Sequence, residues 1–187
     1  MRKIRVYRHS LRDGHFISPE GVDLINSVVA KLQEEKLSIS KVLYSSYIRS
    51  LQTAAYLAIG LGHPEMISYQ IPELSGKKSD EIFFSNDAFM EEYQNNTGED
   101  LTLVVRKHLN PEQISDIEEE SAKTIRICFA HISHGQTAIA VGHTPYISMA
   151  ADYFNERDTE IRVEGKQFEN GHFCGLKEME YIDFIID

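Results

Sequence analysis

The stretch IRVYRHSLRDG, residues 4–14, has the pattern of a strand that ends in a loop. Apolar and polar residues alternate up to Tyr7, which is the period of a β-strand, and a glycine ends the run. Arg8, His9 and Arg12 then crowd together where the strand should turn. Like charges at close range are costly unless an anion lies between them. The stretch therefore predicts a strand whose carboxyl end holds an anion.

Length and composition describe a globular protein. The chain has 187 residues, of which 42% are hydrophobic and 26% charged, so we expect residues 1–187 to form a single domain. No apolar run approaches the roughly 20 residues of a membrane span, and the N-terminus lacks the pattern of a signal peptide. Cys128 and Cys174 form no spaced pattern, so we expect buried thiols and a cytoplasmic location.

The net charge of −10 argues against nucleic acid or an anionic membrane as a partner. It leaves room for a small phosphorylated substrate or a phosphoprotein, because a local group of arginines dominates at short range. No cofactor is expected, and the sequence does not indicate an oligomeric state.

Strand and helix patterns alternate along most of the chain. Helical spacing covers residues 18–36, 47–62, 121–135 and 145–155, and strand patterns cover 41–46, 66–71, 137–143 and part of 172–186. Such alternation predicts an α/β fold: a three-layer sandwich with a mainly parallel central sheet and helices on both faces. In the helix over 47–62, the apolar spacing places Leu51 and Ile59 on the inner side.

Residues 73–120 depart from this alternation. They are expected to form a helical, cap-like insertion over the catalytic edge of the sheet, with one helix over residues 80–96. Its four aromatic side chains are interpreted as the insertion's own core, with a substrate wall as the alternative: Phe83, Phe84, Phe89 and Tyr93.

Three strand ends carry residues that suit a phosphate. Arg8 and His9 follow the first strand, Arg49 lies in the first turn of the helix after the second, and His143 ends a later strand. Ligands of parallel sheets bind beyond the carboxyl ends of the strands. Guanidinium groups match phosphate oxygens, and helix N-termini favour anions, so these residues predict a phosphate site.

The segments YRHS, SSYIRSLQTA and VGHTP, in this order and spacing, resemble the signature segments of the histidine phosphatase superfamily, the phosphoglycerate-mutase-like group. The resemblance covers roughly residues 1–62 and 121–155. It implies that His9 is the nucleophile that accepts the phosphoryl group, and that Arg8, Arg49 and His143 hold the phosphate oxygens. The form RHSLR also resembles the acid-phosphatase branch, which would make Arg12 a further phosphate contact. Neighbouring arginines are expected to lower the pKa of His9 and keep it neutral.

The sequence departs from the family pattern at three points. Ser10 stands where the family usually has glycine, so the pocket could be altered. Thr144 replaces the aspartate that donates a proton in the acid-phosphatase branch. In the mutase-like branch a glutamate after the third strand is the donor, and Glu73 occupies about that place; Asp13 is the alternative.

The expected function is that of a metal-independent phosphatase, a phosphoric monoester hydrolase acting on a phosphomonoester or a phosphohistidine. A phosphotransferase or mutase and a non-catalytic phospho-ligand-binding protein are the alternatives. His131 and His134 lie three residues apart, but no carboxylate or cysteine spacing supports a metal site there.

Overall fold

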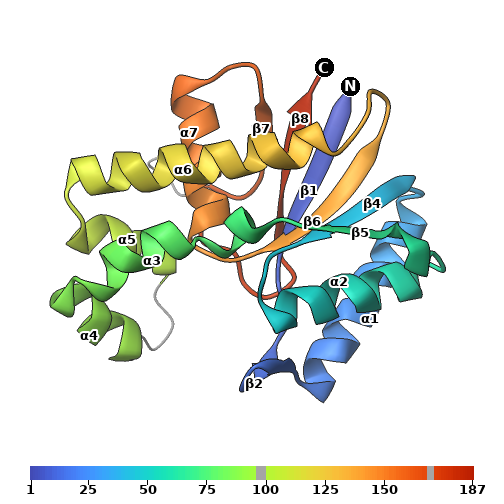
Figure 1. The fold of residues 1–187 in the computed structure, drawn as a ribbon, viewed down its shortest axis with the longest axis horizontal. Helices are drawn as coiled ribbons and strands as arrows, with labels where there is room; N and C mark the ends of the chain where they lie inside the picture. Colours follow the sequence, from blue (N-terminus) through green and yellow to red (C-terminus); the bar gives the residue numbers. More distant parts are fainter. Residues whose placement is uncertain (96–99, 168–170) are drawn as a thin grey trace.

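The computed structural model describes residues 1–95, 100–167 and 171–187, with the backbone alone at residues 68 and 77–79. Most of its strands form one sheet in the order β5-β4-β6-β1-β8-β7 (Figure 1). The parallel strands are β1 (Arg2–Arg8), β4 (Ile39–Tyr44), β5 (Ile67–Gln70) and β6 (Thr137–Gly142). Strand β8 (Tyr181–Ile186) runs antiparallel to both of its neighbours, β1 and the edge strand β7 (Arg162–Glu164). This confirms the predicted mainly parallel sheet.

Helices cover both faces of the sheet (Figure 1). One face packs against α1 (Pro19–Glu34) and α2 (Ile48–Gly60), and the other packs against α6 (Pro111–Ala130) and α7 (Tyr146–Arg157). Successive residues of a strand point to opposite faces. Accordingly Ile4 and Val6 lie in the core beneath α6 and α7, while Tyr7 lies in the core beneath α1 and α2. The three-layer sandwich is confirmed.

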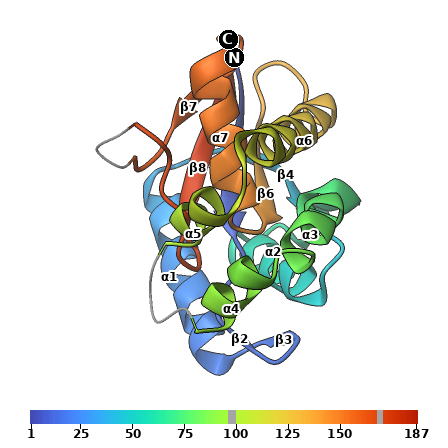
Figure 2. The same ribbon diagram turned by 90° about the vertical axis from the view of Figure 1, so that its left-hand side faces the viewer.

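The insertion helices are α3 (Lys77–Phe84), α4 (Asp87–Asn95) and α5 (Leu101–His108), and they lie beside the sheet at one end of the molecule (Figures 1 and 2). The single helix expected over 80–96 is instead two helices. Asn86 separates them: its side chain accepts a hydrogen bond from the N–H of Phe89 and donates to the carbonyl of His108, and such a side-chain bond favours a helix start over continuation.

Helix α6 is longer than its apolar spacing indicates. It begins at Pro111 rather than near residue 121, with Asn110 and Gln113 forming a capping box. Its acidic first half is not simply solvated, because Glu118 is 2% exposed and is paired with Arg106 and Arg157. Charge composition alone therefore misplaced the start of this helix.

Strand β8 fixes the first strand in the sheet through a buried charge pair. Arg5 and Asp183 are register partners, and the guanidinium donates two hydrogen bonds of 2.8 and 3.0 Å to the carboxylate. A bidentate pair of this kind satisfies both buried groups. Because Arg2 pairs with Ile186 at the other end of the same ladder, the two termini lie side by side (Figure 1).

No helix in the described part of the chain combines the length and the apolar composition that a membrane crossing requires.

Candidate active site

Three neighbouring parallel strands end at one point of the sheet. Strands β4, β6 and β1 are adjacent, and their carboxyl ends are followed by Ser45, His143 and His9. The sheet hydrogen bonding continues into these residues: the N–H of His9 donates to Gly142 O at 3.2 Å, and that of Ser45 donates to Val141 O at 3.1 Å. The backbone under the candidate site is therefore held by the sheet itself.

The imidazole of His9 is fixed in one tautomer. Its Nδ1 lies 2.8 Å from the carbonyl oxygen of Ser10, and a carbonyl can only accept, so Nδ1 carries the proton. The lone pair is then on Nε2, which accepts a 3.0 Å hydrogen bond from Nε of Arg49. Arg49 lies in the first turn of α2, where the sequence placed it. The nitrogen that would attack phosphorus, Nε2, thus faces Arg49, which is expected to bind the phosphate.

His9 is neutral at physiological pH. It is 5% exposed, and its pKa is lowered from 6.5 to about 4, chiefly by burial and further by Arg49, Arg8 and Arg12. A lowered pKa of His9 is what the neighbouring arginines led us to expect. The main cause is different, because desolvation of the charged imidazolium outweighs the cations.

His143 lies against His9, with ring centroids 4.9 Å apart. Its Nε2 is 2.9 Å from the hydroxyl of Ser45 and 3.1 Å from that of Ser50, and its Nδ1 is 3.5 Å from Nη2 of Arg49. Arg49 can only donate, so Nδ1 is the acceptor in that contact. Because a hydroxyl can donate or accept, Nε2 can take either role toward the serines, and Nδ1 can carry a proton once Arg49 turns to a phosphate. Burial holds the pKa of His143 well below the usual range. Ser45 and Ser50 lie in the segment SSYIRSLQTA, but no sequence pattern indicated their contact with His143.

Arg8 is held by a loop that sequence reasoning did not connect to the site. Its Nη1 donates to Leu176 O at 2.8 Å, and its Nη2 forms a 3.0 Å ion pair with Glu178. The hydroxyl of Thr144, next to His143, donates to the same Leu176 O at 3.2 Å. The loop before β8 therefore touches both sides of the candidate site.

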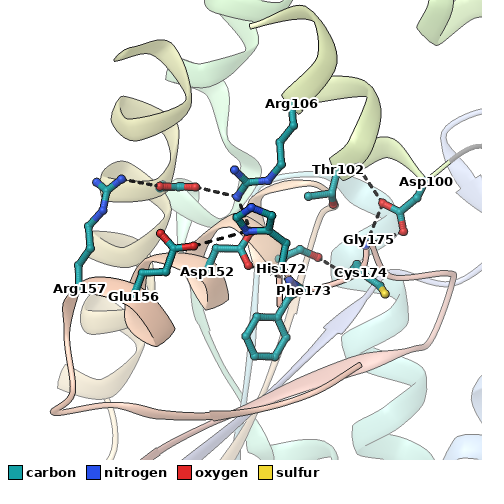
Figure 3. Close-up of polar contacts among 12 residues, drawn as sticks. Asp100, Thr102, Arg106, Asp152, Glu156, Arg157, His172, Phe173, Cys174 and Gly175 are labelled. Atoms are coloured by element: carbon teal, nitrogen blue, oxygen red, sulfur yellow. Dashed lines mark hydrogen bonds and ion pairs between the residues drawn. The ribbon is translucent and has the colours of Figure 1, made fainter. Parts of the chain in front are cut away.

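The same loop is anchored to the insertion and to α7 (Figure 3). The N–H of Gly175 donates to both carboxylate oxygens of Asp100, the N-cap of α5, at 3.0 and 2.8 Å. The N–H of Phe173 donates to Asp152 at 2.7 Å, and Asp152 is in turn paired with Arg106 of α5. These contacts set where the loop carrying Glu178 lies.

A cavity of about 180 Å³ opens beside Arg49 and His143. Asp80 of α3 lies on its wall, and its carboxylate accepts hydrogen bonds from the hydroxyls of Tyr47 and Tyr146. The Tyr47 ring packs against both phosphate candidates, with the Arg49 guanidinium 4.4 Å from its centroid and the His143 ring at 4.8 Å. Asp80 was not predicted, because only the tertiary fold brings α3 to this place. Tyr47 lies in the segment SSYIRSLQTA, but no sequence pattern indicated its contacts.

No family model matches this sequence, and no curated protein matches it either. Solved structures do match by shape. A phosphoglycerate mutase from Bacillus anthracis str. Sterne has a TM-score of 0.56 at 11% identity and covers 99% of this chain and 91% of its own. YhfR from Bacillus stearothermophilus has a TM-score of 0.55 at 16% identity, covering 83% and 81%. A mycobacterial glucosyl-3-phosphoglycerate phosphatase has a TM-score of 0.54 at 13% identity, covering 96% and 98%.

The fold is that of the histidine phosphatases. At these identities the comparison concerns the fold alone. Residue roles must therefore be argued from the site, because one fold can carry many functions.

On this histidine-phosphatase fold, the serine after His9 is fully buried, and its hydroxyl and its N–H are both hydrogen-bonded. The Ser10 hydroxyl donates to Gly21 O at 2.7 Å, away from Nε2 of His9, and its N–H donates to the Thr53 hydroxyl at 3.1 Å. A close backbone approach is found at Gly21, where a Cβ would lie 2.4 Å from Leu11 O.

The remaining predicted residues lie on exposed segments, although Arg12 is near enough to lower the pKa of both His9 and Arg49. Arg12 and Asp13 form β2 (Arg12–Asp13), an exposed strand paired with β3 (Phe16–Ile17), and Arg12 donates to Gly14 O at 3.1 Å. Glu73 lies on the short 3-10 helix Pro72–Ser75 and lines a narrow cavity that His143 also lines. The structure thus brings His9, Arg49 and His143 together, with Arg8 at the rim.

The paired histidines near the end of α6 have other contacts. His131 packs on the Tyr69 ring with centroids 4.7 Å apart, and His134 lies 2.8 Å from the amino group of Met1. In the part of the chain that the structure describes, no group of three or more His, Cys, Asp or Glu side chains is arranged to hold a metal ion.

Proposed function

We propose that the protein is a metal-independent phosphatase that hydrolyses a phosphomonoester or a phosphohistidine through a phosphohistidine at His9. The observation that carries this proposal is the state of His9. Its ring is neutral, its Nδ1 proton is bound to a carbonyl, and its Nε2 lone pair faces Arg49. A neutral imidazole held in this way, beside cations, is suited to attack a phosphate.

In the first step the substrate phosphate displaces Arg49 from Nε2. Arg49, Arg8 and the Nδ1 proton of His143 then bind the phosphate oxygens and stabilise the charge that develops on them. A bond forms between Nε2 and phosphorus, and the bond to the leaving oxygen breaks. The leaving oxygen takes a proton from an acid, which we propose is Glu73.

In the second step a water molecule attacks phosphorus on the phosphohistidine. The same carboxylate accepts a proton from the water, and the bond between phosphorus and Nε2 breaks. Inorganic phosphate leaves, and His9 returns to its neutral state. Every atom and proton comes from the substrate, water or the protein's own side chains.

Glu73 is preferred to Asp80 as the acid for a physical reason. The two carboxylate oxygens of Asp80 each accept a hydrogen bond from a tyrosine hydroxyl, so both are already engaged in the cavity wall. Asp80 is better suited to hold Tyr47 and Tyr146, and with them the insertion, in place. Asp13 remains the alternative on the exposed hairpin.

Two other functions share this chemistry or this site. A mutase would return the phosphoryl group to a substrate instead of water, and one of the structures of similar shape is a phosphoglycerate mutase. A phospho-ligand-binding protein would use the same cations without turnover. A phosphatase of similar shape, acting on glucosyl-3-phosphoglycerate, supports hydrolysis. Cytoplasmic location stays a prediction from the two free cysteines, Cys128 and Cys174.

The decisive test is to trap the intermediate. The protein is incubated briefly with a phosphorus-labelled aryl phosphate in the presence of a chelator and quenched at alkaline pH. We expect acid-labile label on His9, and none in the His9→Ala variant. His15→Ala, which removes an exposed histidine close in sequence, is the matched control and should label normally. Label on a serine or an aspartate, or labelling that requires a divalent ion, would refute the mechanism.

The acid is tested by its dependence on the leaving group. Glu73→Gln should slow an alkyl phosphate by about 100-fold, but an aryl phosphate with an acidic leaving group far less, because that leaving group needs little protonation. Asp80→Asn and Asp13→Asn are the matched comparisons. Equal slowing of both substrates in Glu73→Gln would show that Glu73 has a structural role. If Asp80→Asn or Asp13→Asn shows the dependence on the leaving group instead, that residue is the acid.

A further inference from the structure

The cavity beside Arg49 and His143 has an aromatic wall built by the insertion. The rest of its lining is mixed: Met90, Leu101 and Pro145 are apolar, and the polar groups include Arg49, Asp80 and His143. Five aromatic rings from the insertion and the start of α7 line it: Phe83, Phe84, Phe89, Tyr93 and Tyr146.

Four of these rings form a continuous stack. Tyr146 and Phe83 are 5.9 Å apart at 29°, Phe83 and Phe89 are 4.9 Å apart at 24°, and Phe89 and Tyr93 are 5.9 Å apart at 13°. The inner rings of Phe83 and Phe89 are buried and belong to the insertion's own core. The stack ends at Tyr93, which is 45% exposed, and Phe84 on the same wall is 64% exposed. The stack thus has an accessible end at the cavity.

The size of the cavity sets what can enter. An apolar cavity of about 150 Å³ is enough to bind benzene. This cavity, at about 180 Å³, has room for one six-membered ring. Offset-stacked rings gain energy beyond the area they bury, so a flat ring gains more from such a wall than a saturated ring of the same size.

The wall and the phosphate residues face the same space. Tyr93 and Phe84 line the cavity together with Arg49 and His143, and Tyr93 is near enough to influence the pKa of Arg49. A phosphate held by Arg49 and His143 would therefore place its ester group toward the rings.

We propose that the substrate is an aryl phosphate, whose single ring packs in this cavity against the end of the ring stack at Tyr93 and against Phe84. The proposal rests on the proposed function, since it places the substrate's phosphate at His9. The same chemistry occurs in a free aryl phosphate and in a phosphotyrosine side chain.

Binding of non-hydrolysable phosphonates tests this without turnover. We would measure dissociation constants by calorimetry for benzylphosphonate and for cyclohexylmethylphosphonate, which has the same carbon skeleton but no flat ring. Benzylphosphonate should bind about fivefold more tightly. The same phosphonomethylphenyl group within a short neutral peptide distinguishes the two sources: tighter binding of the peptide indicates phosphotyrosine, and weaker binding indicates a free aryl phosphate.

The ratio of the two dissociation constants is then measured in variants, because a ratio cancels general effects on the phosphate site. Tyr93→Leu and Phe84→Leu should each bring this ratio toward one. Tyr93→Phe, which keeps a flat ring, should have the ratio of the wild type. Tyr69→Leu is the matched control, since Tyr69 is a comparably exposed tyrosine, 47%, that packs on His131 at the sheet edge. Its ratio should equal that of the wild type.

The outcomes separate this proposal from the proposed function. If vanadate inhibits and the two phosphonates bind equally, or neither binds, the ring site is wrong while the phosphate site stands. If the preference for benzylphosphonate survives both leucine variants, the ring does not lie where we place it. If neither vanadate nor any phosphonate binds, the proposed function fails and the ring site fails with it.

Discussion

The neutrality of His9 can be measured directly. The structure lowers its pKa from 6.5 to about 4, chiefly because the ring is 5% exposed. That difference corresponds to about 3 kcal/mol in favour of the neutral ring, at about 1.4 kcal/mol per pKa unit. At pH 5.5 a histidine of ordinary pKa is about nine-tenths protonated, whereas His9 should be almost entirely neutral.

The assay is a pH titration of the imidazole signals by NMR, with the His9 signals assigned by their loss in His9→Asn. This measurement avoids rate profiles, in which the second ionisation of the phosphate ester falls in the same range. We expect the ring of His9 to remain neutral down to about pH 5, because its charged form is desolvated. A midpoint near 6.5 would show that burial does not control this group.

A second titration separates burial from the cations. In Arg49→Gln the charge is removed while an amide donor remains for Nε2. Because burial is the largest cause of the lowered pKa, the midpoint of His9 should rise in this variant yet stay below 6.5. A return to the ordinary value would mean that Arg49, and not burial, keeps His9 neutral.

The lowered pKa of His9 also makes the free energy of unfolding depend on pH. Between pH 4 and 6.5 the unfolded chain binds a proton at His9 that the folded chain does not, so the free energy of unfolding should increase with pH in this window. Urea unfolding at several pH values should show a shallower increase for His9→Asn than for the wild type. Equal slopes in the two proteins would contradict the assigned pKa.

Two further substitutions test the surroundings of the site. Glu178→Gln removes the carboxylate that is paired with Arg8, so inorganic phosphate, measured by calorimetry, should bind several-fold more tightly; unchanged or weaker binding would show that Glu178 helps to position Arg8. Gly76→Ala places a Cβ 2.1 Å from the Tyr146 ring at a φ of +68°, so the free energy of unfolding in urea should fall by about 1–3 kcal/mol. A loss below about 0.5 kcal/mol would mean that α3 and α7 can separate easily.

Helix α2 shows how apolar spacing can mislead near a site. The sequence placed Leu51 and Ile59 on the inner side, but they are 40% and 61% exposed. Ser50 and Thr53 are fully buried instead, because Ser50 contacts His143 and Thr53 accepts a hydrogen bond from the backbone of the loop after β1. A periodicity that counts only apolar residues does not detect a helix face that is buried against polar groups.

The sequence by itself determined the α/β alternation and the meeting of His9, Arg49 and His143. Those residues follow strands, and parallel strands bring their carboxyl ends to one edge whatever lies between them. Only the tertiary structure decided what surrounds them. Arg8 is held by Leu176, 168 positions along the chain, and the insertion meets the site through Asp80. Such contacts depend on how packed elements orient their side chains, and no local pattern of residues encodes that orientation.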